Sequence, residues 1–234
     1  MLLSLLLLHR ACSLATTTSG PSRRRQRMPS LAKKLEATDL ECRLCLEGKG
    51  EGATFHLGLG TFRVPMALHE ANRARAAALL RERHGARARD VALLQGGEQL
   101  LRYDTDHELL FRQESYFQYL FGVSEAGCFG AVSLPSAKAT LFVPELGEDY
   151  EVFCGRYPSP EAFKAAYGVE EVRYLHELPA WLEAQLGEQG ALYLLHGRNS
   201  DSGNWALPAA FAGDGAFAAR RDTEALFGAL AEVR

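Results

Sequence analysis

The stretch from Tyr103 to Leu134 constrains the fold more than any other part of the chain, because two apolar patterns of different period adjoin in it. Phe117, Leu120 and Phe121 recur at helical spacing, and the glycine after them stands where a left-handed residue would end a helix. After a short polar break, residues 128–134 are small and apolar enough for a strand that is covered on both faces. A helix that buries several rings beside a buried strand predicts the centre of the hydrophobic core.

Strand and helix patterns alternate on both sides of this centre. Residues 139–143 repeat the apolar strand pattern of 128–134, and Pro135-Ser136 between them is typical of a turn, so an antiparallel hairpin is expected. Further strands are predicted at 91–94, 169–175 and 191–195, and further helices at 159–167 and 178–186. This alternation predicts an α/β fold with one mixed β-sheet flanked by helices.

One more helix is predicted to start at Val64-Pro65 and to end at Gly85, because proline at the first helical position loses no hydrogen bond. Alanines recur along this helix at helical spacing, and we expect the alanine face to pack on the core; it comprises Ala67, Ala71, Ala74 and Ala78. Residues 144–158, which follow the hairpin, show no regular pattern and are expected to form a loop.

Composition is typical of a soluble globular protein and limits the classes of partner. The chain of 234 residues is 47% apolar and 24% charged, and its formal net charge of −3 gives no electrostatic case for nucleic-acid binding. Five cysteines, an odd number, argue for reduced thiols. Cys42 and Cys45 form a C-x-x-C pair, but the two further ligands of a zinc site do not follow. The apolar run at 2–8 is far shorter than the roughly 20 residues of a membrane span.

Residues 1–52 differ in composition from the rest and are predicted to be a disordered leader, with the folded domain at 53–234. Residues 1–35 contain no Asp or Glu but many Arg, Ser and Thr residues, which is typical of an organellar transit peptide. A disordered basic tail, or an upstream extension before Met28, explains the same composition, and a secretory signal explains it less well. A cytoplasmic location is expected, with organellar import as the alternative.

The cluster Asp104–Glu108 is the most tempting candidate for chemistry, since hard divalent cations accept carboxylate oxygens. Adjacent side chains on extended backbone point to opposite faces, however, so the cluster is interpreted as a polar turn in which Asp106 or Ser115 caps backbone amides. Asn199–Gly203 is rich in turn-forming residues and is interpreted as a structural loop. No catalytic or metal-binding residue is predicted in this chain.

Several runs match a known family in order. They are Arg102-Tyr103 with Thr105-Asp106, Leu110 to Ser115, Phe121-Gly122-Val123 and Leu94 to Glu98. Together they resemble the amino-terminal domain of prolidase, the Xaa-Pro dipeptidase of the aminopeptidase P and creatinase group. The resemblance implies a mixed sheet with flanking helices, as the residue patterns do.

The resemblance also implies where the chemistry of the family lies. Prolidases hydrolyse proline-containing dipeptides with two bridged divalent ions, usually manganese, held by aspartates, a histidine and glutamates of a second, carboxy-terminal domain. The resemblance covers 53–234 and stops near the junction with that domain. It implies manganese in the parent family, none on this chain, and no dipeptidase activity for this chain alone.

Two functions of different class remain open. The chain is either a truncated or partial prolidase, or a stand-alone, non-catalytic module that pairs with itself or with a full-length prolidase, because the family's first domain helps to build a homodimer. In the family, the loop after the hairpin carries an aromatic residue toward the partner subunit's active site. Phe153 occupies the aligned position in place of the usual tryptophan, and is the one substrate-binding residue that the resemblance implies.

Overall fold

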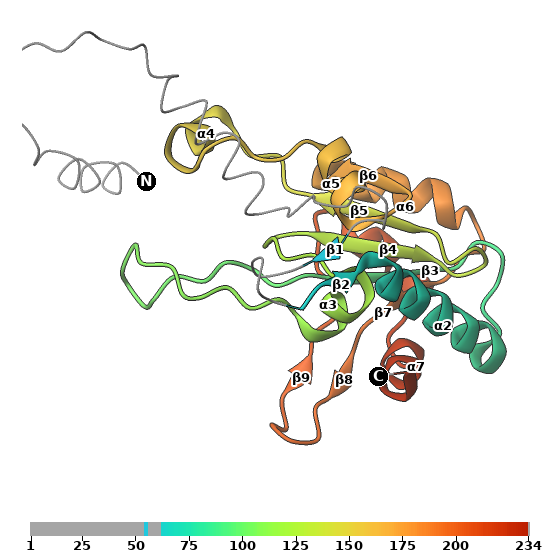
Figure 1. The fold of residues 1–234 in the computed structure, drawn as a ribbon. Coiled ribbons are helices and arrows are strands. Elements are labelled where there is room, and N and C mark those ends of the chain that lie inside the picture. Colours follow the sequence, from blue (N-terminus) through green and yellow to red (C-terminus); the bar gives the residue numbers. More distant parts are fainter. Residues whose placement is uncertain (1–53, 56–61, 234) are drawn as a thin grey trace, which may run out of the picture.

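A computed structural model describes residues 54–55 and 62–233, and a six-stranded mixed β-sheet forms its central layer (Figure 1). The strands lie in the order β10-β7-β3-β4-β5-β6. Their bounds are Val91–Gln95 for β3, Phe129–Ser133 for β4, Ala139–Val143 for β5, Glu171–Tyr174 for β6, Leu192–Leu194 for β7 and Arg221–Asp222 for β10. The predicted α/β class and the predicted strands are confirmed. The predicted leader, 1–52, lies outside the described residues.

The directions of the strands leave one edge of the sheet with almost all of the carboxyl ends. β4 is antiparallel to both of its neighbours, and the predicted hairpin of β4 with β5 is confirmed, with Gly130 opposite Leu141. β7 runs parallel to β3, β10 parallel to β7, and β6 parallel to β5. All strands except β4 therefore point the same way. We call the edge where they end the carboxyl edge.

Helices cover both faces of the sheet. The helices are α2 (Met66–His84), α3 (Ser115–Phe121), α4 (Glu148–Cys154), α5 (Pro160–Tyr167), α6 (Leu178–Leu186) and α7 (Ala225–Val233), with 3-10 turns η2 (Leu175–Glu177) and η3 (Asp214–Arg220). Side chains of α2, α3, α5 and α7 share one buried apolar cluster with the sheet, and those of α6 and η3 share a second. Two small ribbons complete the fold: β1 (Thr54–Phe55) with β2 (Val64–Pro65), and β8 (Gly197–Arg198) with β9 (Trp205–Ala206).

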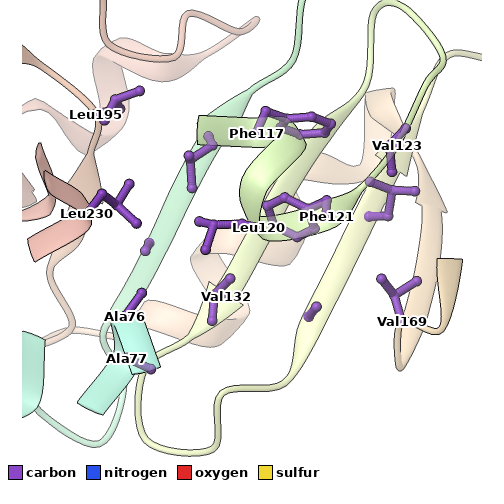
Figure 2. Close-up of a cluster of buried hydrophobic side chains, with 14 of the residues drawn as sticks. Ala76, Ala77, Phe117, Leu120, Phe121, Val123, Val132, Val169, Leu195 and Leu230 are labelled. Carbon is purple, nitrogen blue, oxygen red and sulfur yellow. The ribbon is translucent and has the colours of Figure 1, made fainter. Parts of the chain in front are cut away.

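The helix α3 stands at the centre of the larger cluster, as predicted (Figure 2). Phe117 and Phe121 are fully buried, and their ring centroids lie 5.0 Å apart. Gly122 ends the helix in the left-handed region with φ 67°. Gly130 of β4 has no side chain where the Phe121 ring lies, since a Cβ there would come within 2.4 Å of that ring. The position of the Phe121 ring therefore requires glycine at 130, and the missing side chain of Gly130 leaves the space that the ring fills.

The start of α3 corrects one detail of the prediction. The residue that caps the helix is Glu114, whose carboxylate accepts hydrogen bonds from the amides of Tyr116 and Phe117 at 3.1 and 2.7 Å. Ser115 is the first residue of the helix instead of its cap, and Asp106 lies in a separate turn. A carboxylate at this end of a helix also benefits from the helix dipole.

The buried face of α2 is not the predicted one. The four alanines of the predicted face are exposed, and Pro65 precedes the helix as its N-cap. The buried face comprises Met66, His69, Asn72, Arg73, Ala76, Ala77 and Leu80. Alanine spacing was misleading because three polar residues of this face have specific partners in α3, which apolar periodicity does not reveal.

These partners are the last carbonyl groups of α3, which accept no hydrogen bond from an amide of the same helix. His69 Nδ1 lies 2.9 Å and Asn72 Nδ2 lies 3.0 Å from Tyr119 O. Arg73 Nη1 donates to Leu120 O at 2.9 Å. Burial lowers the pKa of His69, the charge of Arg73 lowers it further, and the contact with Tyr119 O acts in the opposite direction.

We expect Phe117→Ala to lower the free energy of unfolding by about 3–5 kcal/mol, the usual cost of cutting a buried ring to a methyl group. The measurement is urea denaturation followed by circular dichroism. Phe62→Ala is the matched control, because this ring is 84% exposed and its loss should cost less than about 0.5 kcal/mol. Equal losses for the two variants would contradict the placement of α3 in the core.

We expect His69 to make the domain less stable in mild acid. The pKa of His69 in the folded state lies below its ordinary value of 6.5, so the unfolded chain takes up the proton first as the pH falls. Stability contributed by this group is thus present above the unfolded pKa and is lost below it. His69→Gln retains a donor for Tyr119 O and should show a smaller loss between about pH 7.5 and 5.5 in denaturant titrations. His107→Gln, at an exposed site, should behave as the wild type; an unchanged slope in His69→Gln would refute the assignment.

Candidate functional site

The carboxyl edge carries the segments that project from the sheet (Figure 1). Residues 96–113 leave the end of β3, residues 144–158 leave β5, η2 follows β6, and the β8–β9 ribbon follows β7. In open α/β sheets, ligands commonly bind outside the carboxyl ends of the strands. The carboxyl edge is therefore the candidate functional surface of this domain.

A cleft of about 800 Å³ opens at this edge. Its lining residues are Gln95, Glu98, Gly127, Phe129, Pro144, Glu145, Leu175, His176, Pro179, Ala210, Phe211 and Ala212. His176 Nδ1 lies 3.2 Å from Glu145 Oε2, and Gln95 donates to Glu98 Oε1 at 3.1 Å. Carboxylates above apolar and aromatic side chains can bind a positively charged group with an apolar body. The cleft thus has the side chains needed to bind a ligand of this kind.

Residues 98–112 form a projecting hairpin, which we call the arm. Leu101 bridges Glu108, and the amides of Arg102 and Leu109 donate across the hairpin to His107 O and Leu100 O at 2.7 and 2.9 Å. Residues 101–110 are all exposed. The polar turn predicted at 104–108 is confirmed as the tip of the arm, where Thr105 bonds to Arg102 O.

The base of the arm is fixed to the core by Gln113, a role that the sequence analysis missed. Its amide nitrogen donates to Val123 O at 3.0 Å and Glu125 O at 3.1 Å, while its oxygen accepts from the amides of Gly97 and Glu114. A Cβ at Gly96 would come within 2.9 Å of Cys128 O, so glycine is needed there. The match to the family at 110–115 was the available signal for Gln113.

The segment that carries Phe153 differs from the prediction of a loop at 144–158. Residues 148–154 of this segment form α4, whose backbone turns helical after Gly147 and ends at Gly155. Phe153 lies near the end of that helix, and its role in substrate binding stays a prediction. Asn199–Gly203 is confirmed as a structural turn, because Asn199 Oδ1 accepts from the amides of Asp201 and Ser202 at 2.9 Å each.

A half-buried carboxyl group, that of Glu125, lies in the loop between α3 and β4. Tyr167 Oη donates to Glu125 Oε2, and Ser124 Oγ lies 3.1 Å from the same hydroxyl group. Burial raises the pKa of Glu125, although its hydrogen bonds with Tyr167 and Ser124 lower it. Burial likewise raises the pKa of Tyr167. The hydrogen bonds join the end of α5 to this loop.

The described residues do not fit the two-metal group that the resemblance implies. Within residues 54–55 and 62–233, no group of three His, Cys, Asp or Glu side chains could hold a metal ion. Cys42 and Cys45 lie outside this part of the chain, and Cys128 and Cys154 are free thiols. In the same part, no helix is both long and apolar enough to cross a bilayer.

Most large apolar side chains that are exposed lie on the segments that project from the carboxyl edge. Large hydrophobic residues with exposed side chains are few in the described part, and the ones outside these projecting segments are Phe62 and Leu68. Those on the projecting segments are Leu100, Leu101, Tyr103, Leu109, Leu110, Val152, Trp205 and Leu207. Exposed apolar surface is a common feature of interaction sites, so these segments are the candidate interaction segments of the domain.

Comparison with known proteins gives the family. The model of the family described as "Aminopeptidase P, N-terminal domain" matches residues 69–193, more than half of the chain. The chain belongs to this family. It is 43% identical over 162 residues to the Xaa-Pro dipeptidase of Pongo abelii, and 41% identical over 162 residues to that of Homo sapiens. Each alignment covers 69% of this chain and 32% of the relative, so the chain spans about a third of the length of these dipeptidases.

Solved structures agree with this family fold. A Bacillus anthracis protein described as a candidate aminopeptidase P superposes with a TM-score of 0.54 at 17% identity, over 72% of this chain and 40% of that one. At this identity the likeness shows the fold alone. The mixed sheet with flanking helices is thus shared by this aminopeptidase P N-terminal domain and its structural relative.

We expect Glu125→Gln to raise stability at neutral pH. The pKa of Glu125 is higher in the folded than in the unfolded state, so the stability present below the unfolded pKa is lost as the pH rises through the folded pKa. Glutamine stays neutral and still accepts from Tyr167, so the variant should avoid this loss in denaturant titrations from about pH 4 to 8. Glu108→Gln, at an exposed site, is the matched control and should follow the wild type. If Glu125→Gln were less stable than the wild type at pH 8, the inference that the ionised Glu125 carboxylate costs stability would be wrong.

Proposed function

We propose that this aminopeptidase P N-terminal domain is the first domain of a prolidase-type, manganese-dependent metallopeptidase that hydrolyses Xaa-Pro dipeptides. The observation that carries the proposal is the 43% identity to an Xaa-Pro dipeptidase over 162 residues. The chain spans about a third of that relative, and in our proposal the residues that hold two manganese ions belong to another domain. The chain alone then has no dipeptidase activity.

In this proposal the domain contributes recognition instead of bond cleavage. The carboxyl edge brings the cleft and α4 to one side of the sheet, where they would border the substrate of a neighbouring catalytic domain. Phe153 is the residue that we propose to contact the substrate, through its ring against the proline of the dipeptide. Aromatic rings provide apolar contact at small entropic cost.

The second candidate is a stand-alone, non-catalytic module that pairs with itself or with a full-length prolidase. The specific observation in its favour is the set of exposed apolar side chains on the arm and its neighbours. In either role we propose a cytoplasmic protein in which residues 1–52 are a leader. Organellar import is the alternative. Fusion of residues 1–52 to a fluorescent reporter would distinguish the two locations.

The test of the first proposal is hydrolysis of Gly-Pro with added manganese. We expect no turnover by the purified chain, under conditions in which the Homo sapiens Xaa-Pro dipeptidase is active. Asp106→Asn is the control for a metal site at the tip of the arm. Turnover that this substitution abolishes would overturn the proposal, because the domain would then hold a catalytic metal itself.

The role of Phe153 is tested on a mixed complex. The tagged chain, produced together with the Homo sapiens dipeptidase, should capture it, and Phe153→Ala should raise the KM of the complex for Gly-Pro roughly tenfold, about 1.4 kcal/mol of lost contact. Val152→Ala, at the exposed neighbouring position, should leave KM unchanged. Capture with equal KM values for both variants would support the pairing module and exclude Phe153 from the substrate site.

A further inference from the structure

We propose that the cleft at the carboxyl edge is a binding site for a small organic cation, an ammonium or amidinium group on an apolar body. This inference goes beyond the proposed function, because it assigns to the cleft a ligand of its own that is not the dipeptide. It draws on the rings that line the cleft, the hydrogen bonds that hold one wall, and the charges of the lining residues.

Apolar side chains from distant parts of the chain form most of the lining of the cleft. Phe129 is the first residue of β4 and is buried, whereas Phe211 is half-buried, with its ring centroid 5.9 Å from that of Phe217. Pro144 and Pro179 add two rings that restrict the backbone of the walls. A volume of about 800 Å³ lies in the range of sites that take small molecules. The cleft thus offers aromatic surface to the apolar body of such a ligand.

Gln95 holds one wall of the cleft in place. It is the last residue of β3 and lies opposite Phe129 in the sheet. Its side-chain oxygen accepts from the amide of Ala210 at 3.0 Å, and its nitrogen donates to Glu98 Oε1 at 3.1 Å. Gln95 therefore joins the segment 210–212 to the end of β3 and positions a carboxylate beside it. Walls that are already ordered lose little conformational entropy when a ligand binds.

Negative charge prevails among the described residues that line the cleft. The charged or titratable ones are Glu98, Glu145 and His176, and all three are exposed. The partner of Glu98 is the neutral amide of Gln95, so this contact leaves the negative charge uncompensated. Glu145 Oε2 lies 3.2 Å from His176 Nδ1, within reach of a donor that also lines the cleft. A cationic ligand could donate to either carboxylate.

The basic residues around the cleft do not occupy these carboxylates. Three arginines of neighbouring elements pair with acidic residues outside the lining: Arg173 with Glu171 and Glu177, Arg220 with Glu183, and Arg221 with Asp214. Among the described residues no ion pair includes Glu98, although the backbone of Arg112 lies close to Gly97. The charge that a ligand meets in the cleft is therefore negative.

This combination selects a ligand that is positively charged and has no carboxylate. A cation is attracted to the face of an aromatic ring, and hydrogen bonds from a cation to a carboxylate are stronger than neutral ones. An Xaa-Pro dipeptide also carries a carboxylate, which Glu98 and Glu145 would repel. The cleft therefore discriminates against the dipeptide of the proposed function.

The experiment is saturation-transfer NMR of benzamidine with the full chain, and benzamide is the neutral compound of the same shape. We expect benzamidine to bind with a Kd of about 1 mM or tighter, and benzamide about fivefold more weakly. Gly-Pro at about ten times this concentration should not displace benzamidine. Equal affinity for the two aromatic compounds would overturn the selection of a cation. Displacement by Gly-Pro would overturn the separate ligand and assign the cleft to the dipeptide.

Substitutions of the carboxylates show whether benzamidine binds in the cleft. Glu98→Gln and Glu145→Gln should each raise the Kd of benzamidine about threefold, and the two together about tenfold, because charge-assisted hydrogen bonds are lost. Glu108→Gln, at an exposed site of the arm, is the matched control and should leave the Kd unchanged. Circular dichroism checks that each variant is folded.

Two results would overturn the site in the cleft. They are an unchanged Kd in the double variant, and a loss of binding in Glu108→Gln as large as in the double variant. Either result would leave the proposed function intact, since the Gly-Pro hydrolysis test does not depend on the ligand of the cleft.

Discussion

The fold depends on how α2 satisfies the carboxyl end of α3. A helix of seven residues ends with carbonyl groups that need donors, and this end is buried beside the sheet. His69, Asn72 and Arg73 supply these donors from one face of α2. A positive side chain at this end also interacts favourably with the helix dipole. Because α3 carries the buried rings, the same bonds set the position of the core against the sheet.

Arg73 shows what this arrangement costs. The residue is 1% exposed, and its guanidinium lies 5.8 Å from the centroid of the Phe121 ring. Among the residues that the structure describes, its Nε and Nη2 groups find no hydrogen-bond partner. Burial lowers its pKa, while the charges of Glu170 and Glu70 oppose that change. Taking a charge out of water costs free energy, which a single strong acceptor does not fully offset. The hydrogen bond from Arg73 to Leu120 O forms only when this face of α2 turns inward.

Sequence periodicity predicted the elements whose burial is governed by apolar area. The strands β3, β4 and β5 and the helices α3 and α5 follow from runs of apolar residues between glycines and prolines, and Ser159 caps α5 as its type suggests. The face of α2 could not be predicted, because its buried residues are polar and their acceptors lie about 50 positions away in the sequence. Periodicity reports local pattern, whereas such pairs are decided by tertiary contact.

The candidate site was less predictable for the same reason. Nothing in the sequence near α4 distinguishes a short helix from a loop, and the cleft is assembled from segments that follow four different strands. The resemblance to a family supplied Phe153 and the run at 110–115, but the role of Gln113 in fixing the arm required the coordinates of its four partners. The C-terminal elements β10 and α7 were not predicted, because their apolar patterns are short. β10 is held by parallel pairing to β7.

The core and the carboxyl edge are connected through two consecutive residues. Gln113 holds the base of the arm, and Glu114 caps the helix whose rings fill the core. The interactions that order α3 thereby also order the base of the arm, whose leucines face solvent. Exposed leucines contribute nothing to the folding of an isolated domain. They promote association of the domain with a second surface that covers them. An ordered arm with exposed leucines thus makes structural sense when a second surface covers it.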